Sequence, residues 1–270
     1  MPTPPESVRW NTALITGATR GIGYAFAKRL ASEGTNLVLV ARDTAKLAAL
    51  AEQLHRAHGV QVEILPADLT RAEELAQVET RLGTVPNIDL LVNNAGTANM
   101  GSFRRLSVDA ETDSVRLNIV ALMRLSHAAM HAMLAAGRGN ILNISSIAGH
   151  QPFPGMANYA ATKAFVSNFS EALHEETKGS GVTVTAVQVG FVRTEMTGVM
   201  HELDSLPDFL WLQADDIAAG ALQGARRGLA RVTPTFKYKL LSAAMGLLPR
   251  ARKRKRLGKI ARHAASNVTS

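Results

Sequence analysis

Two side chains in the second half of the chain are spaced for proton transfer. Tyr159 and Lys163 lie four residues apart in Asn158–Lys178, whose apolar periodicity predicts a helix, so both side chains share one helix face. The pKa of a phenol is about 10, too high for acid–base chemistry near neutral pH, and a neighbouring ammonium lowers it by favouring the phenolate. An isolated Tyr and Lys at this spacing would ordinarily be a surface pair. The rest of the chain decides between the two interpretations.

A glycine-rich turn near the N-terminus is suited to bind a pyrophosphate. The predicted strand that ends at Thr16 runs into Gly17-Ala18-Thr19-Arg20-Gly21-Ile22-Gly23, and a predicted helix follows. Glycines let the backbone approach a phosphate closely, and the start of the helix offers free N–H groups and the positive end of its dipole. Such glycines also serve in tight strand–helix turns that bind nothing. The position at the first strand–helix junction favours the cofactor interpretation.

The elements that must position these groups alternate along the chain. Short, nearly continuous apolar runs predict strands at Thr12–Thr16, Asn36–Val40, Gln61–Leu65, Asp89–Val92, Asn140–Ile144 and Thr183–Val189. Amphipathic periodicity predicts helices over Ile22–Ser32, Thr44–His58, Ala72–Leu82, Val108–Ala136 and Asn158–Lys178. This alternation implies right-handed βαβ units. We therefore predict an α/β fold, a Rossmann-like doubly wound parallel sheet with helices on both faces.

The predicted domain organisation follows from the same patterns. We expect a single dinucleotide-binding and catalytic domain over residues 1–234, with a flap over the site at about 191–212. A basic C-terminal extension follows over residues 235–270. The flap region mixes Gly198, Pro207, Trp211 and charged residues without a clear period. No internal repeat or Gly/Ser linker divides the chain.

Three motifs together resemble those of the short-chain dehydrogenase/reductase family, over about residues 10–234. They are the T-G-x-x-x-G-x-G loop at 16–23, Asn93-Asn94-Ala95-Gly96 after the fourth strand, and Tyr159-Ala160-Ala161-Thr162-Lys163. The resemblance implies an oxidoreductase that moves a hydride between a nicotinamide cofactor and a carbonyl or alcohol carbon. It implies that Tyr159 is the proton donor and acceptor, and that the protein is a homodimer or homotetramer.

The resemblance also supplies the rest of the catalytic set. The serine of the family lies 13 residues before the tyrosine, which selects Ser146 to hold the substrate oxygen and leaves Ser145 as a packing or capping residue. Asn118, on a predicted helix, matches the asparagine that binds a water relaying protons from Lys163. A buried asparagine within a helix needs compensating hydrogen bonds, and a purely structural role for Asn118 is the alternative.

The cofactor contacts are implied in the same way. They are expected from Gly17, Thr19, Arg20, Gly21, Ile22, Gly23, Arg42, Asp68, Leu69, Asn94, Ala95, Gly96, Tyr159, Lys163, Gly190, Val192 and Thr194. The stretch from Gly190 to Thr194 would contact the nicotinamide carboxamide and the phosphates. One departure lies here, because the family usually reads Pro-Gly and this chain reads Val189-Gly190. Without the proline, φ at position 189 is not fixed, and the turn is less defined by the sequence.

The end of the second strand favours NADP(H) over NAD(H). In NAD-preferring relatives an acidic residue there binds the ribose 2′-hydroxyl, but this chain has Ala41 followed by Arg42. Guanidinium groups of Arg42 and Arg20 would suit a 2′-phosphate. Asp43 is interpreted as the N-cap of the next helix. Asp68 would hold the adenine amino group, or cap the helix that starts near Arg71, or do both.

Charge is divided unevenly between body and tail. Residues 217–270 carry 13 of the 30 Lys and Arg and no acidic residue, which leaves 17 basic against 22 acidic residues before them. The tail combines apolar Phe236–Leu248 with six basic residues in 250–256. Three interpretations remain open: a peripheral membrane anchor, in which each cation near anionic lipid contributes ~1 kcal/mol; an apolar wall of the substrate pocket; or nucleic-acid binding, for which aromatic interleaving is sparse.

Other function classes are weaker. Zero cysteines exclude disulfides and thiolate metal sites, and His127 and His131 lack the glutamate of H-E-x-x-H, so we expect no metal. A serine hydrolase would need G-x-S-x-G, which is absent. The remaining alternative is a non-catalytic NADP-binding or membrane-associated scaffold of the same fold. We expect a cytoplasmic protein, because no signal peptide opens the chain and no apolar stretch reaches about 18 residues, with peripheral membrane contact as the addition that the tail suggests.

The substrate is expected to be an apolar small-molecule carbonyl or alcohol. The residues that suggest an apolar pocket are Phe153, Phe191, Met196, Met200, Phe209 and Trp211. Ordinary packing of the flap would explain the same residues.

Overall fold

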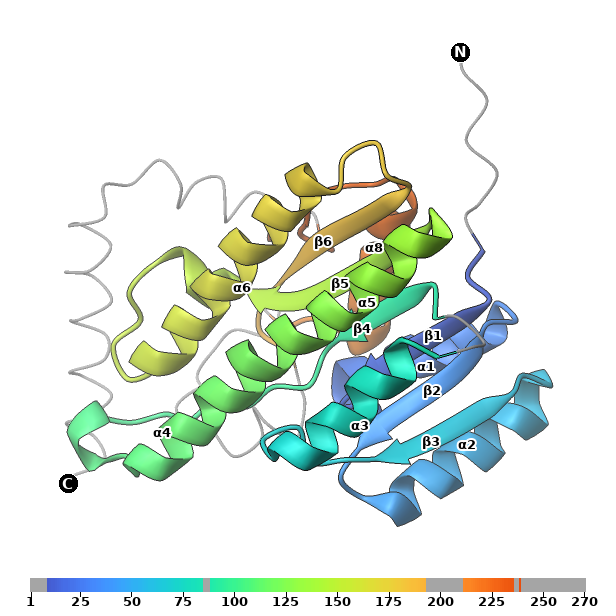
Figure 1. Ribbon diagram of the computed structural model, residues 1–270. Helices are drawn as coiled ribbons and strands as arrows, with labels where there is room; N and C mark the ends of the chain where they lie inside the picture. Colours follow the sequence, from blue (N-terminus) through green and yellow to red (C-terminus); the bar gives the residue numbers. More distant parts are fainter. Residues whose placement is uncertain (1–8, 85–87, 193–210, 236–237, 239–270) are drawn as a thin grey trace.

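A seven-stranded parallel sheet organises the chain, in the order β3-β2-β1-β4-β5-β6-β7. The computed structural model describes residues 9–84, 88–192, 211–235 and 238 (Figure 1). The strands are β1 Thr12–Thr16, β2 Asn36–Ala41, β3 Val62–Pro66, β4 Leu90–Asn93, β5 Gly139–Ser146, β6 Val182–Val189 and β7 Arg231–Val232. The reversal of strand order between β1 and β4 makes this sheet doubly wound, as predicted.

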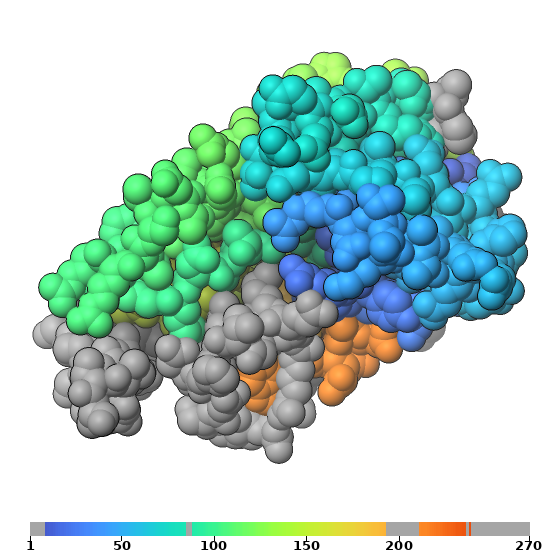
Figure 2. Space-filling view, turned by 90° about the horizontal axis from the view of Figure 1, so that it is seen from below, coloured from blue at the N-terminus to red at the C-terminus, as the bar shows by residue number. Residues whose placement is uncertain are grey.

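Helices cover both faces of the sheet. They are α1 Gly21–Ser32, α2 Thr44–His58, α3 Ala72–Leu82, α4 Val108–Val115, α5 Leu122–Ala136, α6 Ala157–Glu176 and α8 Ala214–Arg226, with short 3-10 segments η1 Phe103–Arg105 and η3 Ile147–His150. In Figure 1, α3, α5 and α6 lie in front of the strands and α1 and α8 lie behind. Seen from below, the orange of α8 adjoins the blue of the N-terminal elements (Figure 2).

Strand residues alternate between two cores, one on each face. Ala13 and Ile15 of β1 point to the core shared with α1, α2 and α8, and Leu14 points to the core shared with α3 and α5. The N-terminal end is fixed by Trp10, whose indole Nε1 donates to Asn140 Oδ1 at 2.7 Å. The alternation matches the period of two that a strand imposes, and burial on both faces explains why these strands are apolar throughout.

The predicted helix over Val108–Ala136 is continuous but contains a π-helical segment, η2 Arg116–Ala121, between α4 and α5. By length and composition it is the one helix in the described residues that could cross a membrane, which corrects the expectation that no apolar stretch is long enough. A core helix of a soluble protein passes the same test. Here Leu125, Ala129 and Met133 pack into the core under the sheet face, so the helix is part of the α/β layer.

One α-helix, α8, and one strand, β7, were not predicted from the sequence. Gly220 and Gly224 lower the helix propensity of the α8 segment, which hides its pattern. Both glycines allow close packing, because a Cβ on Gly224 would lie 2.1 Å from a side-chain carbon of Val232 and a Cβ on Gly220 would lie 2.9 Å from Pro234. Tertiary packing therefore outweighs local propensity here.

Candidate active site

The glycine turn and the Asn-Asn-Ala-Gly motif meet at the carboxyl ends of β1 and β4. Asn94 Nδ2 donates to the carbonyl oxygens of Thr16 and Gly17, at 2.9 and 3.2 Å. The hydroxyl of Thr16 accepts from the backbone N–H groups of Asn94 and Ala95, at 3.0 and 2.9 Å. The two motifs thus form one rigid surface, although they are far apart in the sequence.

Glycines are required in this surface for steric reasons. Gly17 and Gly21 have φ of 65° and 53°, in the left-handed region that favours glycine. A Cβ on Gly23 would lie 2.2 Å from Gly17 O and 2.6 Å from Asn94 Nδ2. Helix α1 begins at Gly21 with no acidic residue in its first turn, and Thr19 and Ile22 are partly buried beside it. The turn therefore forms a backbone cradle at a helix N-terminus, the arrangement that binds phosphate.

The residues predicted around the adenosine ribose follow β2 and β3. Arg20 and Arg42 are exposed, and β2 ends at Ala41. Asp43 accepts from Lys46 N at 3.0 Å, which confirms that it caps α2. Asp43 therefore has the capping role predicted for it, and the side chain of Arg42 is exposed beside it.

Asp68 does not cap α3, which corrects one of the two roles predicted for it. Its carboxylate accepts from the backbone and side chain of Thr70, at 3.0 and 2.7 Å, in a local turn before the helix. These bonds and the charges of Arg42 and Arg71 hold the pKa of Asp68 below its ordinary value, against the opposing and largest single effect of burial. Leu69 is buried in the core. The adenine role for Asp68 stays a prediction.

Helix α6 and strand β5 bring Tyr159, Lys163 and Ser146 together. Lys163 Nζ lies 5.7 Å from the centre of the Tyr159 ring and donates to the carbonyl of Ile144 at 2.8 Å. Ser146 ends β5, and its side chain hydrogen bonds with Tyr159 and accepts from Ala148 N at 3.1 Å. Lys163 and Ser146 are 5% and 7% exposed, whereas Tyr159 is partly buried.

The protein alone does not lower the pKa of Tyr159. Burial raises that pKa above its ordinary value, and the hydrogen bond with Ser146 opposes the rise only in part. Burial also lowers the pKa of Lys163 to about 8. Burial of both groups therefore opposes the charged forms of Tyr159 and Lys163 in this state. Further positive charge is needed for the lowered tyrosine pKa that the sequence suggested.

The side chain of Asn118 is held by hydrogen bonds close to this group. Asn118 Nδ2 donates to Thr97 O at 2.8 Å and to Thr162 Oγ1 at 3.1 Å, and Asn118 Oδ1 accepts from Thr97 N at 3.0 Å. These are the compensating bonds expected for a buried helical asparagine, and they commit its side chain to structure. Any water relay at Asn118 therefore relies on its main chain, which lies in the π-helical segment η2.

Gly96 lies beside the side chains of both Asn118 and Lys163. A Cβ on Gly96 would lie 3.1 Å from Asn118 Oδ1 and 3.6 Å from Lys163 Nζ. Ser145 is confirmed as a packing residue, since its hydroxyl lies 2.8 Å from Lys163 O and 2.7 Å from Ser167 Oγ. The predicted catalytic residues are thus brought into one cluster next to the glycine cradle.

The stretch after β6 is better defined than the missing proline suggested. Val189 remains in β6 and pairs in register with Ser146 of β5, and Gly190 follows as the first residue of the turn. Tyr238, which the sequence analysis did not single out, packs on Gly190. Its hydroxyl accepts from Phe191 N at 3.2 Å. No pattern around Tyr238 could have indicated this long-range contact.

Apolar side chains line the approach to Tyr159. Met156 is buried, and six partly buried apolar residues pack around it. These six are Ala98, Met100, Phe153, Tyr159, Phe191 and Trp211. Three of the residues predicted for the pocket are therefore in this cluster. Thr194, Met196, Met200 and Phe209, with most of the predicted flap, lie outside the described residues.

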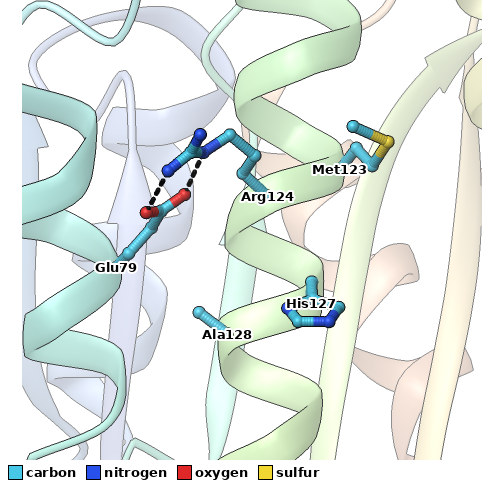
Figure 3. Close-up of a pocket in the computed structure, with 5 residues that line it drawn as sticks. All are labelled: Glu79, Met123, Arg124, His127 and Ala128. Carbon is cyan, nitrogen blue, oxygen red and sulfur yellow. Dashed lines mark hydrogen bonds and ion pairs between the residues drawn. The ribbon is translucent and has the colours of Figure 1, made fainter. Parts of the chain in front are cut away.

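A separate, open pocket of about 310 Å³ lies on the outer surface of α3 and α5. Figure 3 shows Glu79 of α3 paired with Arg124 of α5, beside Met123 and His127. None of its lining residues belongs to the predicted site. The ring centres of His127 and His131 lie 4.3 Å apart with the ring planes tilted by 52°, and the described residues contain no group of three metal-ligating side chains around them.

Comparisons with known proteins agree with this geometry. A sequence profile of the family described as short chain dehydrogenase matches residues 11–203. Among curated proteins, the chain is similar to a very-long-chain 3-oxoacyl-CoA reductase of Coprinopsis cinerea, with 36% identity over 249 residues that cover 87% of this chain and 71% of the relative.

Two solved structures share the fold at appreciable identity. One is a short-chain dehydrogenase from Sphingobium yanoikuyae in complex with NADPH, 40% identical, with a TM-score of 0.79 over 89% of this chain and 97% of the other. The second is the bulky-bulky ketone specific alcohol dehydrogenase from Comamonas testosteroni, 34% identical, with a TM-score of 0.77 over 90% of this chain and 97% of the other.

Proposed function

The chain belongs to the short chain dehydrogenase family, and from this premise we propose how its residues perform the reaction. It is an NADP(H)-dependent oxidoreductase that interconverts a carbonyl and an alcohol. The observation that carries the proposed mechanism is the cluster of Ser146, Tyr159 and Lys163 beside the glycine cradle. A scaffold without catalysis would not need Ser146 bonded to Tyr159 with Lys163 Nζ 5.7 Å from the centre of the same ring.

The residues of this chain fit the cofactor. We propose that the backbone of Gly17–Gly23 holds the pyrophosphate, since this turn, with Gly17 and Gly21 at positive φ, leads into the N-terminus of α1. Arg20 and Arg42 would bind the 2′-phosphate, and Asp68 and Leu69 would contact the adenine. Asn94, Ala95 and Gly96 would contact the adjacent ribose and line the glycine turn. Gly190, Val192 and Thr194 would take the nicotinamide end, with Tyr159 and Lys163 near its ribose. When bound, the cofactor supplies or accepts the hydride.

Proton transfer falls to Tyr159. In reduction, its hydroxyl donates a proton to the carbonyl oxygen while Ser146 hydrogen bonds to the same oxygen and orients it. Lys163, fixed by the Ile144 carbonyl, supplies positive charge while protonated and stands next to the route by which Tyr159 regains its proton. The main chain of Asn118 is the proposed holder of the relay water. In oxidation the same groups act in reverse.

The proposed substrate is a bulky apolar carbonyl or alcohol. The support is the apolar cluster around Met156, which contains Tyr159 itself and therefore borders the reacting oxygen. A relative named for bulky-bulky ketones and one named for very-long-chain acyl groups point the same way. These names describe those proteins, and for this chain a panel of ketones of increasing size is the direct measurement.

The experiment that tests the mechanism is Tyr159→Phe, which removes only the titrating oxygen. NADPH binding should survive, while ketone-dependent NADPH oxidation, followed by absorbance, should fall by orders of magnitude. Tyr24→Phe is the matched control, because the hydroxyl of Tyr24 accepts from Gln53 Nε2 at 3.3 Å on the exposed surface of α1 and α2. Near-native turnover of Tyr159→Phe would show that another group transfers the proton.

We propose a homodimer or homotetramer that associates through α5. Met123 and Leu134 of α5 are 40% and 43% exposed, and Val120 of the adjoining segment η2 is 37% exposed, an unusual apolar strip for a free surface. A second copy that offers the same strip would cover it by two-fold symmetry. The strip also explains why this helix is apolar enough to resemble a membrane span.

The extension from residue 235 has two proposed roles. Its described residue Tyr238 is buried against the body, which supports the interpretation that the apolar segment starting at Phe236 packs near the substrate pocket. The basic cluster at 250–256 lies outside the described residues. We propose that it contacts anionic membrane surface, so that a cytoplasmic enzyme of residues 1–234 would be held at a membrane by residues 235–270. Nucleic acid is not a proposed partner.

A further inference from the structure

Tyr238 is buried in a specific position at the carboxyl end of β6. It is 1% exposed and belongs to the core that contains Val189, Val192 and Leu212. It is also the described residue that links the C-terminal extension to the body of the protein. A buried tyrosine brings a hydroxyl that needs a partner, so its place in this core is chemically demanding.

The Tyr238 ring can occupy this position because residue 190 is glycine. A Cβ on Gly190 would lie 2.2 Å from Cζ and 2.3 Å from Cε1 of Tyr238, much closer than two carbon atoms can approach. The ring therefore lies flat against the glycine backbone. Glycine at 190 and tyrosine at 238 are sterically matched across a long sequence separation.

The hydroxyl of Tyr238 also fixes the next peptide group. It accepts from Phe191 N at 3.2 Å, while the carbonyl of Phe191 accepts from Leu212 N at 2.8 Å. Val192 and Leu212 then form a parallel β-bridge. Both polar groups of the Phe191 backbone are thus held by residues that follow it in the chain.

The bonds from Tyr238 and Leu212 to the backbone of Phe191 form a clamp on this turn. The clamp replaces the constraint of the proline that position 189 lacks. Val189 continues the strand beside Ser146, so its backbone does not fix the direction of the turn that follows in the way a proline ring would. Tyr238 and Leu212 supply that direction from outside the strand. The clamped residues, Gly190 to Val192, are the ones proposed to meet the nicotinamide end of the cofactor.

We infer that Tyr238 is a positioning residue for the nicotinamide end of the cofactor site, through which the C-terminal extension controls the Gly190–Val192 turn. The inference rests on the proposed assignment of that turn to the nicotinamide. Tyr238 touches the turn and acts through it. Through the turn, Tyr238 positions the nicotinamide ring against Tyr159. It does not affect the adenosine end of the cofactor, which Arg20 and Arg42 are proposed to bind.

The test compares two ligands on the full-length Tyr238→Phe variant. NADPH spans the whole site, whereas adenosine 2′,5′-bisphosphate occupies only the adenosine end. Loss of the acceptor for Phe191 N–H should raise the Kd of NADPH about threefold to tenfold and leave that of the bisphosphate within twofold of wild type. Equal weakening of both ligands, or an unchanged NADPH affinity, would overturn the inference.

A second set of variants tests the steric match. Gly190→Ala should weaken NADPH more than Tyr238→Phe does, and Gly190→Ala with Tyr238→Ala should bind NADPH better than Gly190→Ala alone, because the colliding ring is gone. Gly83→Ala is the control, since its Cβ would make only an ordinary contact, 3.6 Å from Thr80 O. If the losses of NADPH affinity caused by the two substitutions simply add in the double variant, the inference about Tyr238 would also be overturned. Wild-type protein that fails to bind NADPH would instead contradict the proposed function.

Discussion

Lys163 should make the protein less stable at neutral pH, and its replacement by methionine should show by how much. Burial lowers the pKa of Lys163 from its ordinary 10.5 to about 8. The folded protein therefore gives up this proton more readily than the unfolded chain. The cost of holding the charge is fully present below pH 8, shrinks as pH rises from 8 toward 10.5, and is absent above that range.

The magnitude follows from the difference between the two pKa values. Each pKa unit corresponds to about 1.4 kcal/mol, so ionised Lys163 lowers the free energy of unfolding by about 3 kcal/mol at pH 7. Lys163→Met keeps the aliphatic chain and removes this cost, but it also removes the hydrogen bond to Ile144 O, worth about 1 kcal/mol. We expect the variant without cofactor to be more stable than wild type by about 2 kcal/mol at pH 7, and to be nearly inactive.

The measurement is urea unfolding of both proteins without cofactor at pH 6.5, 8 and 9.5. The stability advantage of Lys163→Met should be largest at pH 6.5 and should decline at pH 9.5, because wild type gains stability as Lys163 loses its proton. Lys178→Met is the control: that lysine is 71% exposed, and its effect should stay within about 0.5 kcal/mol. A Lys163→Met variant that is less stable at pH 6.5, or whose advantage does not change with pH, would refute the reasoning.

Three further predictions concern cofactor choice, assembly and the tail. Arg20→Ala with Arg42→Ala should weaken NADPH about tenfold to a thousandfold relative to NADH, with Arg56→Ala on α2 as the control; equal weakening of both cofactors would refute the 2′-phosphate assignment. Met123→Glu should reduce the oligomer mass in analytical ultracentrifugation, whereas Gln53→Glu should not; an unchanged mass would exclude α5 as the interface. Truncation after Pro249 should abolish sedimentation with anionic vesicles while activity on a small ketone persists. Full-length protein that ignores such vesicles at low salt would eliminate the membrane role.

Much of the fold was predictable because its strands are buried on both faces. The continuous apolar runs located β1 to β6 within a residue or two, and α2 and α3 were predicted with their observed bounds. Helix α8 was missed because Gly224 packs against Val232 of β7 and Gly220 against Pro234, which a local pattern cannot show.

Predictability within the site followed the range of the interactions. Tyr159 and Lys163 share a helix, so their proximity follows from spacing alone, and the family motifs indicated Ser146 and Asn118. Tyr238 could not be predicted, since its contact with Gly190 depends on where a distant segment returns to the sheet. The raised pKa of Tyr159 was also beyond the sequence, because it depends on how deeply the folded chain buries the phenol.

The bond between Thr16 and Asn94 has a consequence for how the chain is synthesised and folded. These residues are 78 positions apart, and β1 pairs with β4 on the edge opposite β2. While the ribosome makes residues up to about 90, one edge of β1 has no partner, and the buried hydroxyl of Thr16 has neither of the N–H groups that later bond to it. An unpaired apolar edge of this kind invites aggregation and slows folding. The nascent first third of the chain should therefore depend on chaperone protection until β4 emerges.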